Sequence, residues 1–188
     1  MNLMHDQHLN EALREDKNNM YKIVFLDVDG TLVSEVDGCI PLSAKKAVKR
    51  LIDKGIKVVV ATGRPHSMCR EFMSMEIETI ISANGALIKC NEAIIYKSVI
   101  SKDIVQDLSA FAELNGNAIS YFTEIITMNG IGSNDRRVME ALNETLGLTQ
   151  YPERMHPLQD EIFCTCLYAD ERETENPKLS HSEMVETT

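Results

Sequence analysis

The sequence predicts an α/β protein in which a Rossmann-like, mostly parallel sheet is followed by a separate α+β unit. Two observations predict the sheet. The β-branched and aromatic runs 21–26 and 56–61 each lead directly into a polar segment, and amphipathic helical patterns separate the strands. The third observation is that this alternation stops near residue 84, where an Asn-Gly pair precedes several consecutive short strands.

The first part contains three expected strands and two expected helices. Val24, Phe25 and Leu26 are consecutive apolar residues, a pattern typical of a strand buried on both faces of a parallel sheet. A helix over residues 42–54 has apolar side chains at helical spacing, and Gly55 ends it. The remaining elements are a strand over 56–61, a helix from Pro65 to about Met75, and a strand over 79–82.

The second part contains short strands and two further amphipathic helices. Each helix ends at a glycine, near Gly116 and at Gly147. Strands followed by helices, rather than regular alternation, predict an α+β unit. The expected strands cover residues 87–89, 93–99, 118–123, 125–128 and 162–168.

Composition and charge exclude several classes of protein. The chain has 188 residues and a net charge of −10, which argues against nucleic acid as a partner. No apolar segment is long enough to span a membrane, so no membrane association is expected. Residues 1–19 show no signal-peptide pattern and predict a flexible N-terminal extension, and residues 171–188 predict a polar tail.

The five cysteines are scattered, which favours reduced thiols in a cytoplasmic protein. Only Cys164 and Cys166 are close in sequence. We expect them to point to opposite faces of a strand, and therefore expect no metal site from them.

The most informative motif is Asp27-Val28-Asp29-Gly30-Thr31, directly after the first strand. Ligands of parallel sheets bind outside the carboxyl ends of the strands, where both carboxylates emerge. Gly30 allows a tight turn whose backbone N–H groups can face an anion. One carboxylate that attacks phosphorus and another that moves a proton suit phosphoryl transfer. The alternative is a structural turn that Asp and Gly stabilise without further function.

A second motif, Thr62-Gly63-Arg64-Pro65, follows the second strand. Its position between a strand end and a helix N-terminus is favourable for binding a phosphate. The alternative is an ordinary strand–helix turn with Thr62 near a capping position. Arg64 has two equal interpretations, contact with a substrate phosphate or pairing with a surface carboxylate.

These segments resemble the haloacid dehalogenase-like hydrolases. The resemblance lies in the strand and Asp-Val-Asp-Gly-Thr-Leu-Val segment, residues 21–33, and in Ala-Thr-Gly-Arg, residues 61–64. Ser-Ala-Asn-Gly-Ala, residues 82–86, and the elements after it resemble the cap of the Cof-type branch. The resemblance implies the N-terminal part of a core sheet over residues 20–83 and an inserted, incomplete α+β cap over residues 84–170.

The resemblance also implies residue roles. The first Asp of the family motif is the nucleophile and a magnesium ligand, which implies these roles for Asp27. The second is the general acid/base, and its backbone carbonyl also meets the metal, which implies these roles for Asp29. The family's Thr and the next amide hold the phosphoryl oxygens, as Thr62 and Gly63 would.

Asn84 and Gly85 would lie at the hinge between core and cap, near the substrate; the alternative is a plain Asn-Gly turn. The activity implied is Mg²⁺-dependent hydrolysis of a small phosphorylated metabolite, such as a sugar phosphate, through an aspartyl-phosphate.

Two elements of the family pattern are not recognised, namely a catalytic Lys and a late Gly-Asp-x-x-Asn-Asp segment. Residues 130–135 can be aligned with that segment, but Ile131 would stand at a metal-ligand position and cannot bind magnesium. We expect Asn134 or Asp135 to cap a helix instead.

The comparison with the family pattern predicts a truncated member of the family. An inactive fragment or pseudoenzyme is the alternative to an active phosphatase. The first strand would lie at the edge of its sheet, and self-association through this edge is expected.

Overall fold

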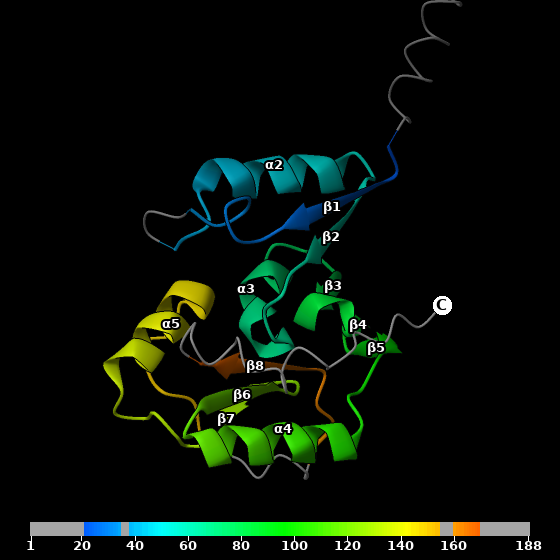
Figure 1. The fold of residues 1–188 in the computed structure, drawn as a ribbon. Coiled ribbons are helices and arrows are strands. Elements are labelled where there is room, and N and C mark those ends of the chain that lie inside the picture. The colour runs from blue at the N-terminus through cyan, green and yellow to red at the C-terminus, as the bar shows by residue number, and fades with distance from the viewer. Residues whose placement is uncertain (1–20, 35–37, 155–159, 170–188) are drawn as a thin grey trace, which may run out of the picture. The chain divides into compact units, whose positions relative to one another are not determined.

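The computed structural model describes residues 21–34, 38–154 and 160–169. The expected N-terminal extension (1–19) and polar tail (171–188) lie outside these residues. The chain divides into two compact units (Figure 1). The first contains the residues up to Gly63 and Met68–Tyr96, and the second contains Arg64–Ser67 and the residues from Lys97 onward. No described helix is both long enough and apolar enough to cross a membrane.

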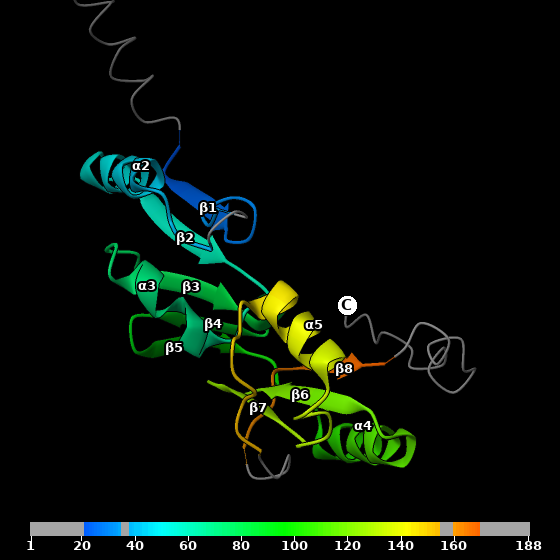
Figure 2. The ribbon, with the colours of Figure 1, turned by 90° about the vertical axis from the view of Figure 1, so that its left-hand side faces the viewer.

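The first unit is built on a five-stranded sheet with the order β1-β2-β3-β4-β5 (Figure 2). Strands β1 (Ile23–Asp27), β2 (Lys57–Ala61) and β3 (Thr79–Ser82) are parallel, which confirms the predicted parallel sheet. Strand β4 (Leu87–Cys90) runs antiparallel to β3, and β5 (Ala93–Lys97) lies beyond it. The architecture is therefore α/β, with a mixed rather than purely parallel sheet.

Strands β4 and β5 continue the first sheet, although the sequence suggested that a separate unit begins at residue 84. After β3 the chain turns through a short 3₁₀ segment, η2 (Ala83–Gly85), and pairs at once with the strand that it has just left. Ile81 lies opposite Ile88 in this antiparallel pair. The loss of strand–helix alternation therefore marks a hairpin-like reversal within the first unit, and the division between the units falls after Tyr96.

Two helical segments accompany this sheet. Helix α2 (Leu42–Asp53) packs Val48 and its neighbouring apolar residues into a core with Val58 and Val60 of β2. The single helix expected from Pro65 to about Met75 is wrong. Residues His66–Cys69 form a 3₁₀ turn, η1, and Arg70–Met73 form a one-turn helix, α3. At Cys69 the backbone has φ −99° and ψ 6°, values outside the α-helical range, so the two segments do not merge.

Strand β1 lies at the edge of the sheet, which confirms the expected edge position. The expectation that it is buried on both faces is wrong. Ile23 is 44% exposed and Phe25 is 58% exposed. The alternate residue Leu26 packs against the core that contains Val58 and Val60. One face of β1 is therefore apolar and open, because no described helix covers it.

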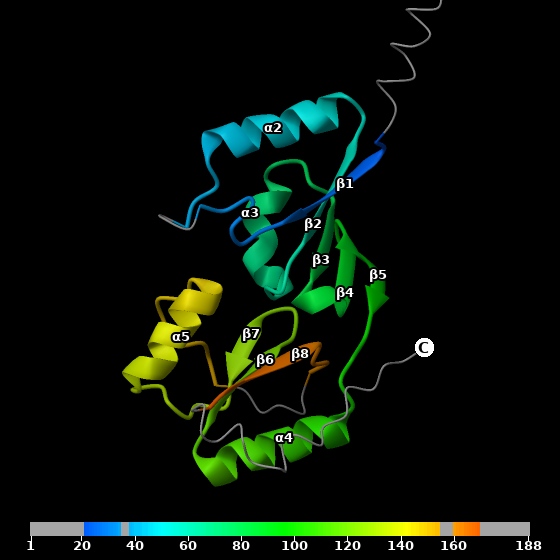
Figure 3. The same ribbon diagram turned by 45° about the horizontal axis from the view of Figure 1, so that its top comes forward.

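The second unit contains a three-stranded antiparallel sheet with the order β7-β6-β8. Its strands are β6 (Ala118–Phe122), β7 (Ile126–Met128) and β8 (Cys164–Tyr168). Helix α4 (Lys102–Asn115) lies along this sheet (Figure 3) and buries Val105 and Ala112 against Ile119 and Tyr121 of β6. The central strand β6 is buried along its whole length, so it forms the middle of this unit.

Capping residues begin and end the two helices of the second unit. Ser101 accepts a hydrogen bond from the Ile104 N–H at the start of α4, and Gly116 ends this helix with φ +70°. Asp135 accepts a hydrogen bond of 2.9 Å from the Arg137 N–H at the start of α5 (Arg136–Leu146). The prediction that Asn134 or Asp135 caps a helix is therefore confirmed for Asp135.

The expectation that Cys164 and Cys166 point to opposite faces is wrong. Both lie in β8, and side chains alternate along a strand, so residues two positions apart share a face. They lie opposite Phe122 and Ser120 of β6, respectively. Both are partly exposed and neither forms a disulfide.

Candidate active site

The Asp27–Thr31 segment forms a tight turn at the carboxyl end of β1. The carbonyl of the buried Val28 accepts backbone hydrogen bonds from Thr31, Leu32 and Val33, at 3.3, 3.0 and 2.9 Å. Gly30 has φ +72°, a conformation that glycine adopts without a steric penalty. Both Asp27 and Asp29 are exposed on either side of Val28. The turn therefore buries one apolar side chain and leaves two carboxylates accessible.

The register between β1 and β2 places the two sequence motifs at the same edge of the sheet. Asp27 is the partner of Ala61, and Thr62 follows Ala61 directly. Thr62 is 6% exposed, and its N–H donates to the Ile81 carbonyl of β3 at 2.9 Å. The carboxyl ends of three adjacent parallel strands thus meet here, as in the ligand sites of open α/β sheets.

Asn84 lies directly against the Gly63 backbone. A Cβ atom added to Gly63 would be 2.8 Å from the Asn84 Oδ1, which is closer than a real contact allows. The Asn84 N–H also donates to the Thr62 carbonyl at 3.3 Å. The structure therefore brings Thr62, Gly63 and Asn84 together, a proximity that no local sequence pattern reveals.

The segment that carries Asn84 has an unusual backbone. Ala83, Asn84 and Gly85 have φ values of +49°, +55° and +92° in succession. Non-glycine residues in this region cost roughly 1–3 kcal/mol each and concentrate at functional sites. Asn tolerates the conformation better than most residues, whereas Ala83 does not. The Asn-Gly pair was the only signal of this conformation in the sequence.

Arg64 belongs to the second unit, whereas Gly63 belongs to the first. Its contact with a substrate phosphate stays a prediction. Ile131 lies between β7 and α5 of the second unit, and Asp135 in the same segment acts as the helix cap. These positions agree with the rejection of residues 130–135 as a metal-binding segment.

The chemistry of Asp27 and Asp29 suits a magnesium ion. Magnesium prefers hard oxygen ligands and is usually held by one or two carboxylates, water and substrate phosphate. Two accessible carboxylates at a strand end supply that donor type. Within the described ranges, no group of three or more His, Cys, Asp and Glu side chains could hold a metal by itself.

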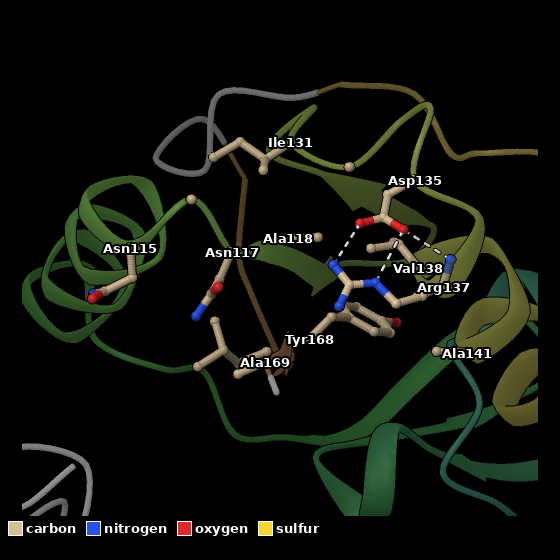
Figure 4. A pocket seen from close by; sticks show the side chains of 13 residues that line it. Asn115, Asn117, Ala118, Ile131, Asp135, Arg137, Val138, Ala141, Tyr168 and Ala169 are labelled. Carbon is tan, nitrogen blue, oxygen red and sulfur yellow. Dashed lines mark hydrogen bonds and ion pairs between the residues drawn. The ribbon is translucent and has the colours of Figure 1, made fainter. Parts of the chain in front are cut away.

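The second unit has a cavity of its own, of about 570 Å³, beside the start of α5 (Figure 4). The Arg137 guanidinium is paired with the Asp135 carboxylate at 3.1 Å, so the two charges compensate each other at its wall. Asn117 also lines the cavity, but its Nδ2 is fully buried and has no hydrogen-bond partner among the residues that the structure describes. None of the predicted site residues lies in this cavity.

Comparison with known proteins identifies the family. The family model of haloacid dehalogenase-like hydrolases matches residues 24–181. The 5-amino-6-(5-phospho-D-ribitylamino)uracil phosphatase YcsE of Bacillus subtilis is 33% identical over 96 residues, which cover 50% of this chain and 37% of YcsE.

Two solved structures share the fold. A hypothetical protein of Geobacillus kaustophilus matches with a TM-score of 0.72 and 27% identity, over 85% of this chain and 62% of that one. The subclass IIB sugar phosphatase BT4131 matches with a TM-score of 0.67 and 29% identity, over 81% of this chain and 60% of that one.

The chain spans at most about three fifths of the length of these relatives. The family model nevertheless covers most of the chain, and both structural matches extend over both units. The chain therefore belongs to the Cof-type haloacid dehalogenase-like hydrolases.

Proposed function

We propose that the chain carries the nucleophile and phosphate-binding part of a Mg²⁺-dependent phosphatase that forms an aspartyl-phosphate. One observation carries this proposal. The register of β1 and β2 sets the Asp27 motif beside Thr62 and Gly63, at the carboxyl ends of paired parallel strands. A nucleophilic carboxylate beside a phosphate-binding turn is what phosphoryl transfer to Asp requires.

The proposed reaction has two steps. An Asp27 carboxylate oxygen attacks phosphorus, the bond to the ester oxygen breaks, and Asp29 gives a proton to the leaving alkoxide. Asp29 then takes a proton from water, which attacks the phosphorus and releases inorganic phosphate from Asp27. A magnesium ion held by the Asp27 carboxylate and the Asp29 carbonyl would neutralise charge on the phosphoryl oxygens.

The remaining site residues bind and position the substrate. The Thr62 hydroxyl, the Gly63 N–H and the turn at Gly30 would hold the phosphoryl oxygens through hydrogen bonds. Asn84 and Gly85, which lie beside Gly63 within the first unit rather than at a hinge between the units, would contact the substrate next to its phosphoryl group. Arg64 would contact the substrate phosphate.

The substrate class that we propose is a small phosphorylated metabolite. YcsE is named for a phosphoribityl compound and BT4131 for sugar phosphates. A net charge of −10 disfavours a polyanionic macromolecule as substrate. We also propose a cytoplasmic location, which agrees with cysteines that are all free of disulfides.

A second candidate function is phosphate binding without turnover, by an inactive fragment or pseudoenzyme. The observation that favours it is the absence, among the described residues, of a cluster of three or more potential metal ligands. Fewer metal ligands would remove part of the electrostatic stabilisation of the transition state.

We further propose that the chain self-associates through β1. Unpaired N–H and C=O groups at a sheet edge form a template for another strand. Phe25 and Ile23 add exposed apolar surface at this edge. The same face contains a groove of about 910 Å³, which Ile81, Ile88 and Ile95 also line.

The test is Mg²⁺-dependent hydrolysis of an aryl phosphate by the purified chain and by Asp27→Asn. Asp53→Asn is the matched control, because Asp53 is an exposed carboxylate at the end of α2 that leads into the amino end of β2, whereas the candidate site lies at the carboxyl ends of the strands. Turnover that requires Mg²⁺ and Asp27, but not Asp53, would support the phosphatase. Equal rates for the chain and Asp27→Asn would refute it and leave phosphate binding to be measured directly.

A further inference from the structure

The two cysteines of β8 form a pair on one face of an outer strand. Cys164 and Cys166 are separated by one residue, and β8 pairs with β6 on one side only within the described sheet. Both side chains are partly exposed, and neither is part of a disulfide. Their cross-strand neighbours, Phe122 and Ser120, offer no competing thiol, imidazole or carboxylate.

The two thiols are neighbours on one face of β8. Hydrogen bonding between the Cys166 and Cys164 thiols, followed by burial, raises the pKa of Cys166 well above its ordinary value. The Cys164 Sγ also donates weakly to the Thr165 carbonyl at 3.8 Å. On the other side of Cys166, the Ser120 and Tyr168 hydroxyls lie 3.4 Å apart. The side chains beside the pair, Ser120, Phe122 and Tyr168, are polar or aromatic and uncharged.

Strand geometry disfavours a disulfide between them. An extended strand advances by about 3.4 Å per residue, so side chains two residues apart are attached about 6.8 Å from each other. A disulfide needs a Cβ–Cβ separation of about 3.5–4.5 Å. Closing the bond would pull β8 away from its pairing with β6.

A bridging ion suits the same spacing. Zinc–thiolate bonds are about 2.3 Å long, so two thiolates on opposite sides of an ion of similar size lie about 4.6 Å apart. This sulfur–sulfur distance is longer than the distance between two touching thiols. It is shorter than the distance between the two backbone positions to which the side chains are attached. Thiolates select soft ions such as Cu(I). Tetrahedral zinc would need four ligands, and no group of three or more His, Cys, Asp and Glu occurs in the part of the chain that the structure describes.

We propose that Cys164 and Cys166 form a two-thiolate site for a soft monovalent cation of the Cu(I) class. Binding replaces the two S–H bonds with two sulfur–metal bonds and releases two protons, and no electron is transferred. The site lies in the second unit and does not depend on the proposed phosphatase activity.

The experiment is an anaerobic titration of the reduced full chain with Cu(I), in competition with a chromogenic Cu(I) chelator. We expect the chain to withdraw one Cu(I) from the chelator, and Cys164→Ser and Cys166→Ser each to lose this ion. Cys90→Ser is the matched control, because Cys90 is a partly exposed strand cysteine in β4 with no cysteine two residues away. Its Cu(I) uptake should equal that of the unmodified chain.

Two results would overturn the proposal. One is that the unmodified chain withdraws no Cu(I). The other is that Cys164→Ser or Cys166→Ser retains the ion. Circular dichroism of each variant identifies unfolding, and X-ray absorption of the copper-loaded chain gives a second readout. Two sulfur neighbours are expected there, and nitrogen or oxygen neighbours would contradict the site.

Discussion

The contact between Gly63 and Asn84 gives the sharpest test of the candidate site. Gly63→Ala adds a methyl group 2.8 Å from the Asn84 Oδ1, so the side chain of Asn84 must move. Both residues are exposed and the Asn84 Oδ1 is the end of a movable side chain, so the overpacking should cost about 1 kcal/mol, the low end of the range for packed sites. Gly63 is not among the glycines with positive φ, so alanine fits its backbone and gains about 0.4–1 kcal/mol from the unfolded state. The two contributions nearly cancel, and we expect Gly63→Ala to lower the unfolding free energy by less than about 0.6 kcal/mol.

Without the Asn84 side chain, Gly63→Ala should become clearly stabilising. In an Asn84→Ala background the obstructing oxygen is absent, so only the unfolded-state term remains. Gly63→Ala should then stabilise the chain by about 0.4–1 kcal/mol. The intrinsic cost of Asn84→Ala at φ +55° is present in both members of that comparison and cancels.

The assay is urea unfolding of the four chains that form this double-mutant cycle. The expected coupling energy between the two positions is about 1 kcal/mol. If Gly63→Ala changes the unfolding free energy by the same amount in both backgrounds, the two residues are not in contact and the reasoning is refuted.

Three further predictions concern the core of the first unit, the exposed sheet edge and the buried tyrosine Tyr121. Phe72→Ala should lower the unfolding free energy measured in urea by about 3–5 kcal/mol, because Phe72 is buried. The control Leu114→Ala, at an exposed position of α4, should change it by less than about 0.5 kcal/mol. Phe25→Lys should lower the sedimentation coefficient toward that of the monomer, whereas Leu114→Lys, at an exposed position outside β1, should leave it unchanged. Equal effects of the two substitutions would refute association through β1. Burial raises the pKa of Tyr121, despite its hydrogen bond of 2.9 Å with Ser109. The resulting stability is present below about pH 10 and is lost as the pH rises through the folded-state pKa. The unfolding free energy should therefore fall more steeply above about pH 10 for the chain than for Tyr121→Phe, and parallel curves would contradict this assignment.

The order of strands and helices could be predicted because most elements carry a clear local period. The strands near residues 21–26, 56–61 and 79–82 are found at nearly the expected positions, and glycines end α4 and α5 as expected. Burial in a parallel sheet explains the continuous apolar run of β2, and left-handed glycine explains the helix ends.

These local patterns could not predict which strands pair with each other in the sheets. The sequence of β1 is that of a doubly buried strand, but exposure depends on which neighbours the sheet contains. Likewise, β4 could join the first sheet only through a reversal at residues 83–86, whose positive φ values the Asn-Gly pair signals incompletely.

Within the candidate site, the motifs located Asp27, Asp29, Thr62 and Gly63, and the strand register explains why they share one edge. The contact of Asn84 with Gly63 arises from the return of β3 to that edge. Pairwise contacts of this kind need three-dimensional coordinates or many related sequences.

The charges at the two ends of β1 should disfavour unlimited aggregation through this strand, without preventing the pairwise association proposed above. Lys22 and Asp27 flank the apolar run Ile23–Leu26, and charged residues beside such a run act as gatekeepers against intermolecular β-structure. Asp27→Asn removes one of the two gatekeepers together with the proposed nucleophile. A loss of soluble protein in that variant would therefore imitate a loss of catalysis, and rates must be normalised to the folded, soluble fraction. Asp27→Glu keeps the gatekeeper charge while displacing the carboxylate, and it separates the two effects.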